Sequence, residues 1–144
     1  MQAIRSFLIV LFMAVASTAV AQQTISISEL VNTKWRVENN WISDYKEYTL
    51  TEIIWKRKDG SFFKSPYYLT DTPVTSYDKS VFDYSKVGKT KKGSYMVSIN
   101  EKMGIVYCSS IESFDKKKGV LVIKVVTQGL IGASGGIERY KLVK

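Results

Sequence analysis

Hydrophobic and polar residues alternate through most of the chain, in short runs that turn-forming residues separate. From Thr33 to Ile42, for example, Trp35 and Val37 alternate with charged neighbours, which is the period of a strand with one buried face. Runs of this kind predict strands at 33–42, 47–57, 61–70, 94–100, 104–114, 119–128 and 137–143. Only residues 28–32 favour a helical turn. The chain is therefore predicted to be all-β.

Two stretches complicate this pattern. Pro66 interrupts the run 61–70 and favours an edge, a bulge or a bend over a central paired position. Residues 74–90 fit a short additional strand around Ser80 to Tyr84, and their Ser, Thr and Asp residues fit an ordered loop as well. We favour the strand. Eight strands then run up and down in an antiparallel meander, which removes its exposed edges by closing into a barrel.

The composition limits the chemistry that the chain can perform. Its 144 residues, 45% hydrophobic and 24% charged, suit one globular domain. The chain has no His to act as a metal ligand or general base, and a single residue, Cys108, cannot close an intramolecular disulfide. Gly132–Gly136 matches the Gly-x-Ser-x-Gly motif of hydrolases, but it precedes a strand and lacks a His partner. We expect no catalytic residues, no metal and no cofactor.

The first 21 residues have the features of a signal peptide. Arg5 is followed by the apolar stretch 7–15 and by Ala19-Val20-Ala21, a small-x-small cleavage site. The apolar stretch is shorter than the ~20 residues that a membrane span needs. The sequence therefore predicts cleavage near Ala21, export to the periplasm or the medium, and a single barrel domain at 22–144.

A helical turn that leads into a Trp-bearing strand gives the chain a family resemblance. Leu30 and Val31 are followed by Thr33-Lys34-Trp35, and this arrangement resembles the small lipocalin-like domains of secreted bacterial proteins, which belong to the calycin group. Lipocalins usually have Gly-x-Trp here, whereas this chain has Thr33 in place of the Gly. The resemblance implies a roughly eight-stranded barrel in which Trp35 is structural. It also implies that Arg139 or Lys141 of the last strand packs over that ring.

The resemblance further implies that one end of the barrel opens to a ligand. In an eight-stranded meander the loops 39–44, 71–73, 100–103 and 129–132 share one end, and they carry the apolar residues Trp41, Leu130 and Ile131. These residues either line the mouth of a pocket or plug the barrel as core. Tyr68, Tyr95 and Tyr107 lie in predicted strands, where they either fill the interior or supply hydroxyl groups to a ligand.

The formal net charge of +8 collects in three turns. The same alternation of turns places them together at the opposite end, as a basic pole made of Lys56, Arg57, Lys58, Lys89, Lys91, Lys92, Lys116, Lys117 and Lys118. Such turns either keep hairpin tips soluble or contact an anionic envelope surface. Nucleic acid is not an expected partner, because no aromatic residues are interleaved with the lysines.

Two functions fit these features. The first is an exported lipocalin-like protein that binds a small apolar or amphipathic ligand in the barrel without chemistry. The alternative is an extracytoplasmic interaction protein with a filled barrel, which contacts the envelope surface or another protein, for example as an inhibitor. An open interior favours the first function, and an interior filled by Trp and Tyr favours the second.

Overall fold

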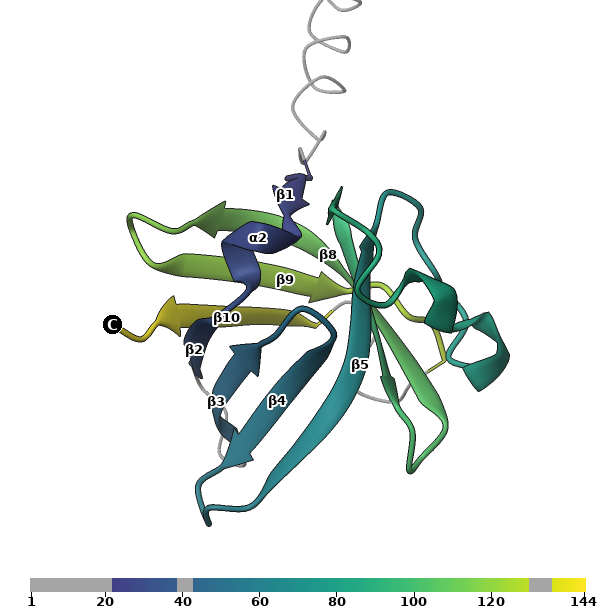
Figure 1. Ribbon diagram of the computed structural model, residues 1–144, viewed down its shortest axis with the longest axis horizontal. Coiled ribbons are helices and arrows are strands. Elements are labelled where there is room, and N and C mark those ends of the chain that lie inside the picture. Colours follow the sequence, from purple (N-terminus) through teal and green to yellow (C-terminus); the bar gives the residue numbers. More distant parts are fainter. Residues whose placement is uncertain (1–21, 39–42, 130–135) are drawn as a thin grey trace, which may run out of the picture.

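The structure is a closed antiparallel β-barrel (Figure 1). The computed structural model describes residues 22–38, 43–129 and 136–144; the predicted signal peptide lies outside them. Eight strands close in the order β10-β2-β3-β4-β5-β7-β8-β9. Their bounds are β2 Thr33–Val37, β3 Ser43–Tyr48, β4 Glu52–Arg57, β5 Phe62–Thr70, β7 Tyr95–Asn100, β8 Ile105–Asp115, β9 Val120–Val125 and β10 Ile137–Leu142. The predicted all-β, up-and-down barrel is confirmed.

Short elements at the N-terminus close one end of the barrel. The strand β1 (Ile25–Ser26) pairs with β6 (Lys92–Gly93), and α2 (Ile27–Leu30) follows it directly. Leu30 of α2 is fully buried and belongs to the main core cluster. Burying this side chain fixes α2 against the barrel, at what we call the α2 end.

Large aromatic side chains fill the interior near the α2 end. Trp35, Tyr48 and Tyr67 are each at most 1% exposed. The ring of Trp35 packs at 5.8 Å from that of Phe114, and Tyr48 meets Tyr67 edge-on at 5.6 Å. Aromatic pairs at such separations are favourable beyond the surface that they bury. This half of the barrel is therefore a packed core.

The predicted strand 47–57 is wrong, because the chain turns back in its middle. β3 ends at Tyr48 and β4 begins at Glu52. The Thr49 hydroxyl accepts hydrogen bonds from the backbone N–H groups of Thr51 (3.3 Å) and Glu52 (2.9 Å). A threonine side chain thus stabilises a tight turn that contains no Gly, Pro, Asn or Asp.

The predicted strand around Ser80 to Tyr84 is also wrong, and the loop alternative describes the segment. It contains two 3₁₀ turns, η1 (Lys79–Val81) and η2 (Tyr84–Lys86). The carboxylates of Asp78 and Asp83 cap them by accepting backbone N–H bonds two residues later, at 2.8 and 3.0 Å. Hydrogen bonds between these aspartate carboxylates and nearby backbone N–H groups stabilise the turns, in place of the backbone pairing of a strand. The eighth barrel strand is instead β3, which begins at Ser43 and shares only Glu47 and Tyr48 with the predicted strand 47–57.

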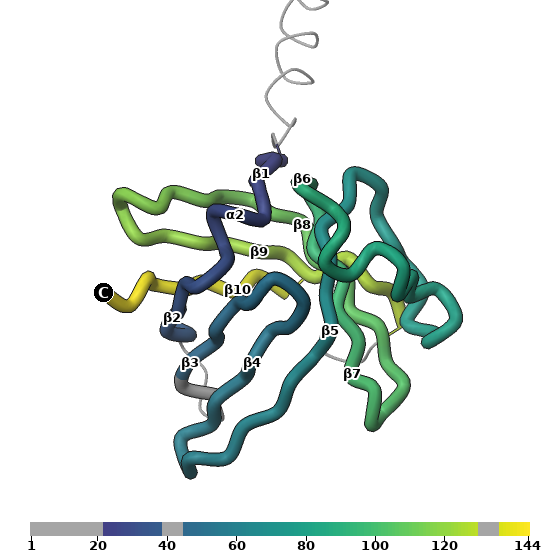
Figure 2. Tube along the Cα trace, in the orientation of Figure 1, coloured from purple at the N-terminus to yellow at the C-terminus, as the bar shows by residue number. Residues whose placement is uncertain are grey.

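The barrel wall divides at Pro66. β5 pairs with β4 from Phe62 to Pro66, but it pairs with β7 only from Tyr67 to Thr70. Because the Tyr67 N–H donates to the Thr51 carbonyl on the β4 side, the nitrogen of Pro66 faces β7, where it has no hydrogen to donate. Beyond this point β5 and β7 separate, as Figure 2 shows. We call this separation the fork, and the end towards which it opens the fork end.

The observed strands overturn the single basic pole. In this antiparallel order the β4–β5 and β7–β8 turns lie at the fork end, and the β3–β4 and β8–β9 turns lie at the α2 end. Lys56, Arg57 and Lys58 therefore lie at the fork end. The other members lie at the α2 end: Lys89, Lys91, Lys92, Lys116, Lys117 and Lys118. Because the chain reverses direction at the hairpin turn 49–51, Lys56, Arg57 and Lys58 lie at the end opposite to the other basic residues.

Candidate ligand-binding site

A cavity of about 210 Å³ occupies the half of the barrel interior towards the fork end. One part of its wall is apolar: Ile53 and Trp55 of β4, Phe63 of β5, and Ile123 and Val125 of β9. Trp55 and Phe63 stack with ring centres 5.8 Å apart and planes within 6° of parallel. The two rings form an aromatic part of the cavity wall, against which a ring or a hydrocarbon chain can pack.

The rest of the wall carries hydroxyl and amide groups. Ser65 of β5, Ser98 and Asn100 of β7, and Tyr107 and Ser109 of β8 line it. Ser65 and Ser109 are buried, whereas Ser98, Asn100 and Tyr107 are half-buried. The partly exposed side chains belong to β7 and β8, on one side of the fork. The cavity is thus amphipathic and becomes more exposed towards the fork.

Lys46 is the only buried cation among the described residues, with 2% of its surface exposed. Its ammonium nitrogen lies over aromatic faces, 4.4 Å from the ring centre of Trp55, 4.6 Å from Tyr140 and 5.3 Å from Tyr48. Such cation–π contacts partly replace the water that burial removes. The side chain also lines the cavity.

A short polar chain connects Lys46 to a carboxylate. The Lys46 ammonium donates to the Tyr140 hydroxyl at 3.4 Å, and that hydroxyl donates to Glu138, which also lines the cavity. Burial lowers the pKa of Lys46 from its usual 10.5 to about 8, against the opposing influence of the Glu138 charge. Burial, together with the charge of Glu138, raises the pKa of Tyr140 well above its ordinary value. The tyrosine therefore stays protonated as a bridge.

Beside Lys46 lies a buried donor that has no hydrogen-bond partner among the described residues. The hydroxyl of Tyr48 is buried and makes no hydrogen bond to any described residue. Burial, the neighbouring Tyr67 and the charge of Glu138 raise its pKa well above the ordinary value. The hydroxyl therefore keeps its proton, and it remains a potential donor beside the Lys46 group.

The three tyrosines that were predicted as ligand residues lie on different faces of the barrel wall. Tyr107 lines the cavity. Tyr68 and Tyr95 belong to a second core on the outer face of the barrel, where Phe82 of the 71–91 connection covers Tyr68 at 5.1 Å. Their prediction as ligand residues is corrected, because their side chains point away from the interior. Trp41, Leu130 and Ile131 lie outside the described residues.

The predicted contact of Arg139 with Trp35 is also corrected. Arg139 is exposed on β10, whose inward positions are Glu138 and Tyr140, and Trp35 is fully buried inside the barrel. An inward ring and an outward guanidinium on neighbouring strands cannot meet. Lys141, the other candidate, is exposed as well and pairs with Glu38 at 3.1 Å.

Sequence reasoning missed Lys46 and Glu138. Both are charged residues at inward positions, in phase with Tyr48 on β3 and Tyr140 on β10. That alternation could have identified them if the end of β3 had been recognised. The signal is a single charged residue at an inward position of a strand whose neighbouring inward residues are aromatic.

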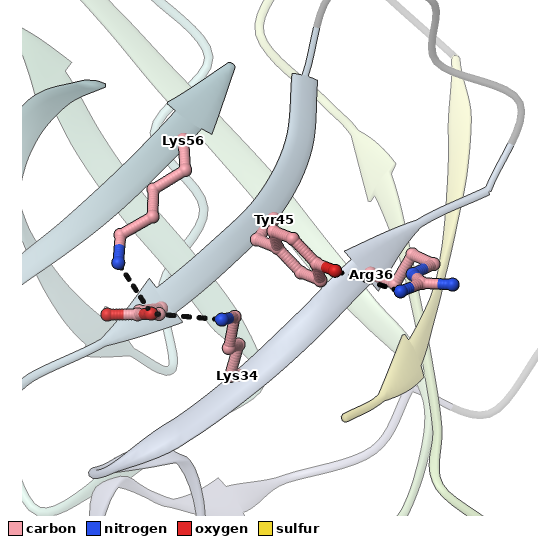
Figure 3. Close-up of polar contacts among 5 residues, drawn as sticks. Lys34, Arg36, Tyr45 and Lys56 are labelled. Carbon is pink, nitrogen blue, oxygen red and sulfur yellow. Dashed lines mark hydrogen bonds and ion pairs between the residues drawn. The ribbon is translucent and has the colours of Figure 1, made fainter. Parts of the chain in front are cut away.

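Basic residues on the outer wall of the same strands are held in surface contacts (Figure 3). The Lys56 and Lys34 ammonium groups lie 3.0 and 3.8 Å from the Glu47 carboxylate. Arg36 donates to the Tyr45 hydroxyl at 2.9 Å. Such partly exposed pairs contribute little to stability, but they leave Lys56 less available than Lys58 for an external partner.

Among the described residues no three acidic or Cys side chains gather as a metal site. No helix within the described ranges is long and apolar enough to cross a membrane.

A closed, up-and-down antiparallel barrel with an internal cavity is compatible with a lipocalin-like fold. No protein-family model, no curated protein and no solved structure matches the chain.

Proposed function

We propose that the barrel binds a small amphipathic molecule in the cavity behind the fork, without changing it chemically. The observation that carries the proposal is the unfilled space of about 210 Å³, with an aromatic wall on one side and hydroxyl groups on the other. An apolar cavity of about 150 Å³ accepts benzene. The space therefore suits a ligand with one ring or a chain of about eight carbons.

The polar part of the wall favours an amphipathic ligand over a purely apolar one. Ser98, Asn100 and Tyr107 would lose water on contact with a hydrocarbon and gain nothing in return. The signal-like segment 1–21 supports a site of action outside the cytoplasm. The protein would then hold or carry its ligand after export.

Titration with 1-octanol and octanoate tests the proposal, with intrinsic tryptophan fluorescence and calorimetry as readouts. Trp55 forms part of the wall, so a bound chain changes its emission. In Ser98→Leu a larger side chain occupies the cavity, and we expect at least a tenfold loss of affinity for whichever probe binds. Ser28→Leu, at an exposed position of α2, is the matched control and keeps full affinity.

Unfolding in urea shows whether Ser98→Leu still folds. A folded Ser98→Leu that binds as tightly as the wild type contradicts binding in this cavity. Absence of binding by both probes to the wild-type protein contradicts the proposal as a whole.

Contact with an anionic envelope surface is a second candidate, and the fork end favours it. Phe62 and Met103, each 62% exposed, lie on the β4–β5 and β7–β8 hairpins. Arg57 and Lys58 belong to the same hairpin as Phe62, next to Asp59, and Lys102 lies between Glu101 and Met103 in the sequence. Exposed apolar side chains with basic neighbours are typical of segments that rest on anionic lipid.

Co-sedimentation with phosphatidylglycerol vesicles at low ionic strength tests the second candidate. We expect binding that Phe62→Ser with Met103→Ser weakens severalfold. Leu50→Ser is the matched control, because Leu50 is 48% exposed on the β3–β4 turn at the α2 end. Absence of binding to the wild type at low ionic strength excludes this candidate.

A further inference from the structure

We propose that the ligand of this cavity carries a carboxylate group, and that Lys46 holds this group inside the barrel. The hydrocarbon part of the ligand lies along Trp55 and Phe63. The inference rests on the proposed function and specifies the chemical class of its ligand.

Lys46 makes fewer hydrogen bonds than its ammonium group can donate. A lysine ammonium group has three N–H donors. Among the described residues it meets one oxygen acceptor, the Tyr140 hydroxyl, at a long 3.4 Å. Its other close neighbours are the faces of aromatic rings, which attract the charge but offer no lone pair along a single direction. Buried donors without acceptors are rare in folded proteins and indicate a missing partner.

Lys46 has no direct counter-ion among the described residues. No described carboxylate lies within 4.0 Å of the Lys46 ammonium. Glu138, whose charge acts on Lys46, is separated from it by the Tyr140 hydroxyl and accepts a hydrogen bond from that group. Glu138 is also half-buried and retains contact with water. Among the described groups of this site, the one without a direct counter-ion is therefore the Lys46 ammonium.

The donors around Lys46 distinguish between the possible chemical classes of ligand. A carboxylate forms short, charge-assisted hydrogen bonds with an ammonium group, and it also accepts from the unpartnered Tyr48 hydroxyl if it reaches that group. An alcohol supplies one neutral acceptor and leaves the charge uncompensated. An amine would place a second cation beside Lys46. The observed donors therefore fit an anionic oxygen ligand best.

The position of Lys46 also sets the orientation of the ligand. Lys46 pairs across the sheet with Trp35 and Trp55, next to the packed core at the α2 end. Phe63, Asn100 and Tyr107 lie towards the fork. The ligand therefore lies with its carboxylate deep in the barrel and its hydrocarbon part along the aromatic side of the cavity, at Trp55 and Phe63.

Binding of this kind is linked to protons. With the pKa of Lys46 at about 8, the ammonium form predominates below pH 8 and is lost above it. Glu138, Tyr140 and Tyr48 are the other titratable groups that act on this site. The pKa values of both tyrosines are raised well above 10, so neither loses its proton in the range in which Lys46 titrates. A carboxylate ligand, which favours the charged lysine, therefore loses affinity as the pH rises through about 8.

Three probes of equal chain length test the inference on the whole predicted domain, residues 22–144: octanoate, 1-octanol and octylamine. Calorimetry at pH 7 measures their affinities for the wild type, for Lys46→Met and for Lys64→Met. Lys64 is an exposed residue of β5, so its variant has the same change in net charge without touching the cavity. Urea unfolding confirms that each variant folds, and Lys46→Gln replaces Lys46→Met if the latter does not.

We expect octanoate to bind at least tenfold more tightly than 1-octanol and octylamine to bind weakest. Lys46→Met should remove the preference for octanoate while 1-octanol binding stays within twofold, and Lys64→Met should resemble the wild type. Octanoate affinity should fall between pH 7 and 9.5, and 1-octanol affinity should not. Equal binding of octanoate and 1-octanol, or full octanoate affinity in Lys46→Met, overturns the carboxylate inference alone. Failure of all three probes to bind overturns the proposed function with it.

Discussion

The indole N–H of Trp35 donates a 2.7 Å hydrogen bond to the hydroxyl of Thr33, two residues earlier on the same face of β2. The same hydroxyl donates to the carbonyl of Leu30 at the end of α2. Both side chains are buried. Thr33 therefore satisfies a buried indole donor and joins the first barrel strand to the helical turn. The glycine that lipocalins usually have at this position has no side chain to do so.

Removing this hydroxyl should destabilise the protein. Thr33→Val keeps the shape of the side chain but leaves the indole N–H buried without an acceptor. We expect a loss of about 1–3 kcal/mol in the free energy of unfolding, measured by urea denaturation with fluorescence detection. Thr33→Ser keeps the hydroxyl and should lose clearly less. If Val and Ser are equally tolerated, the hydrogen bond contributes nothing measurable.

Most strands could be predicted from alternation because each barrel strand has one buried and one outer face. The errors occurred where side chains replaced the usual turn residues. Thr49 forms a hairpin turn without Gly or Pro, so two strands were merged into one. Asp78 and Asp83 form 3₁₀ turns in a segment rich in aromatics, so a loop was taken for a strand. The prediction of an eight-stranded barrel was still correct, because one strand was missed and one was wrongly added, which leaves the number of strands unchanged.

The binding site was less predictable than the fold, for a physical reason. Whether an aromatic residue faces the interior depends on the phase of its strand, and the second core under residues 71–91 buries the outward Tyr68 as completely as the interior buries Tyr67. Because both faces of β5 are buried, the alternation of its residues does not show which face points into the barrel. Lys46 could not be identified as interior without the end of β3, because charged residues are expected on outer faces.

The pH dependence of stability should show the cost of burying Lys46. Its pKa falls from 10.5 to about 8 on folding, so between these values the unfolded chain binds more protons and the free energy of unfolding rises with pH. The full gain corresponds to about 3 kcal/mol. Above about pH 10 stability should fall again, because Tyr48 and Tyr140 ionise more easily in the unfolded chain.

Lys46→Met provides the control for this pH profile. It should be more stable than the wild type at pH 7 by up to about 3 kcal/mol, since it buries no charge, and its stability should not rise between pH 8 and 10. Urea denaturation at intervals of half a pH unit measures both proteins. A wild-type profile that stays flat or falls across this window would show that the buried lysine keeps an ordinary pKa.

Pro66 should control the width of the fork. If the register that pairs Tyr67 with Ser98 is continued by one residue, Ile99 lies opposite position 66. Pro66→Ala provides an N–H that faces β7, and we expect it to extend the ladder by one pair. Hydrogen exchange followed by NMR should then show a protected amide at residue 66, and octanoate should associate several times more slowly. Rapid exchange of that amide would mean that the fork is held open by side chains and not by the proline.

Gly93 should be the least replaceable glycine of the described chain, because β6 crosses very close to β5. A β-carbon at Gly93 would lie 2.4 Å from the backbone nitrogen of Thr70 and 2.6 Å from its carbonyl oxygen. Since backbone atoms cannot rotate away, Gly93→Ala must separate β6 from the barrel and disturb its pairing with Ile25. We expect a loss of at least about 2–3 kcal/mol in the free energy of unfolding.

Gly60→Ala is the control. Gly60 has a φ of +87°, but a β-carbon built there would have no atom beyond its chain neighbours within 4 Å. This variant should therefore lose only about 1 kcal/mol, from backbone strain. Equal losses for the two variants in urea denaturation would show that β6 can move off the barrel at little cost.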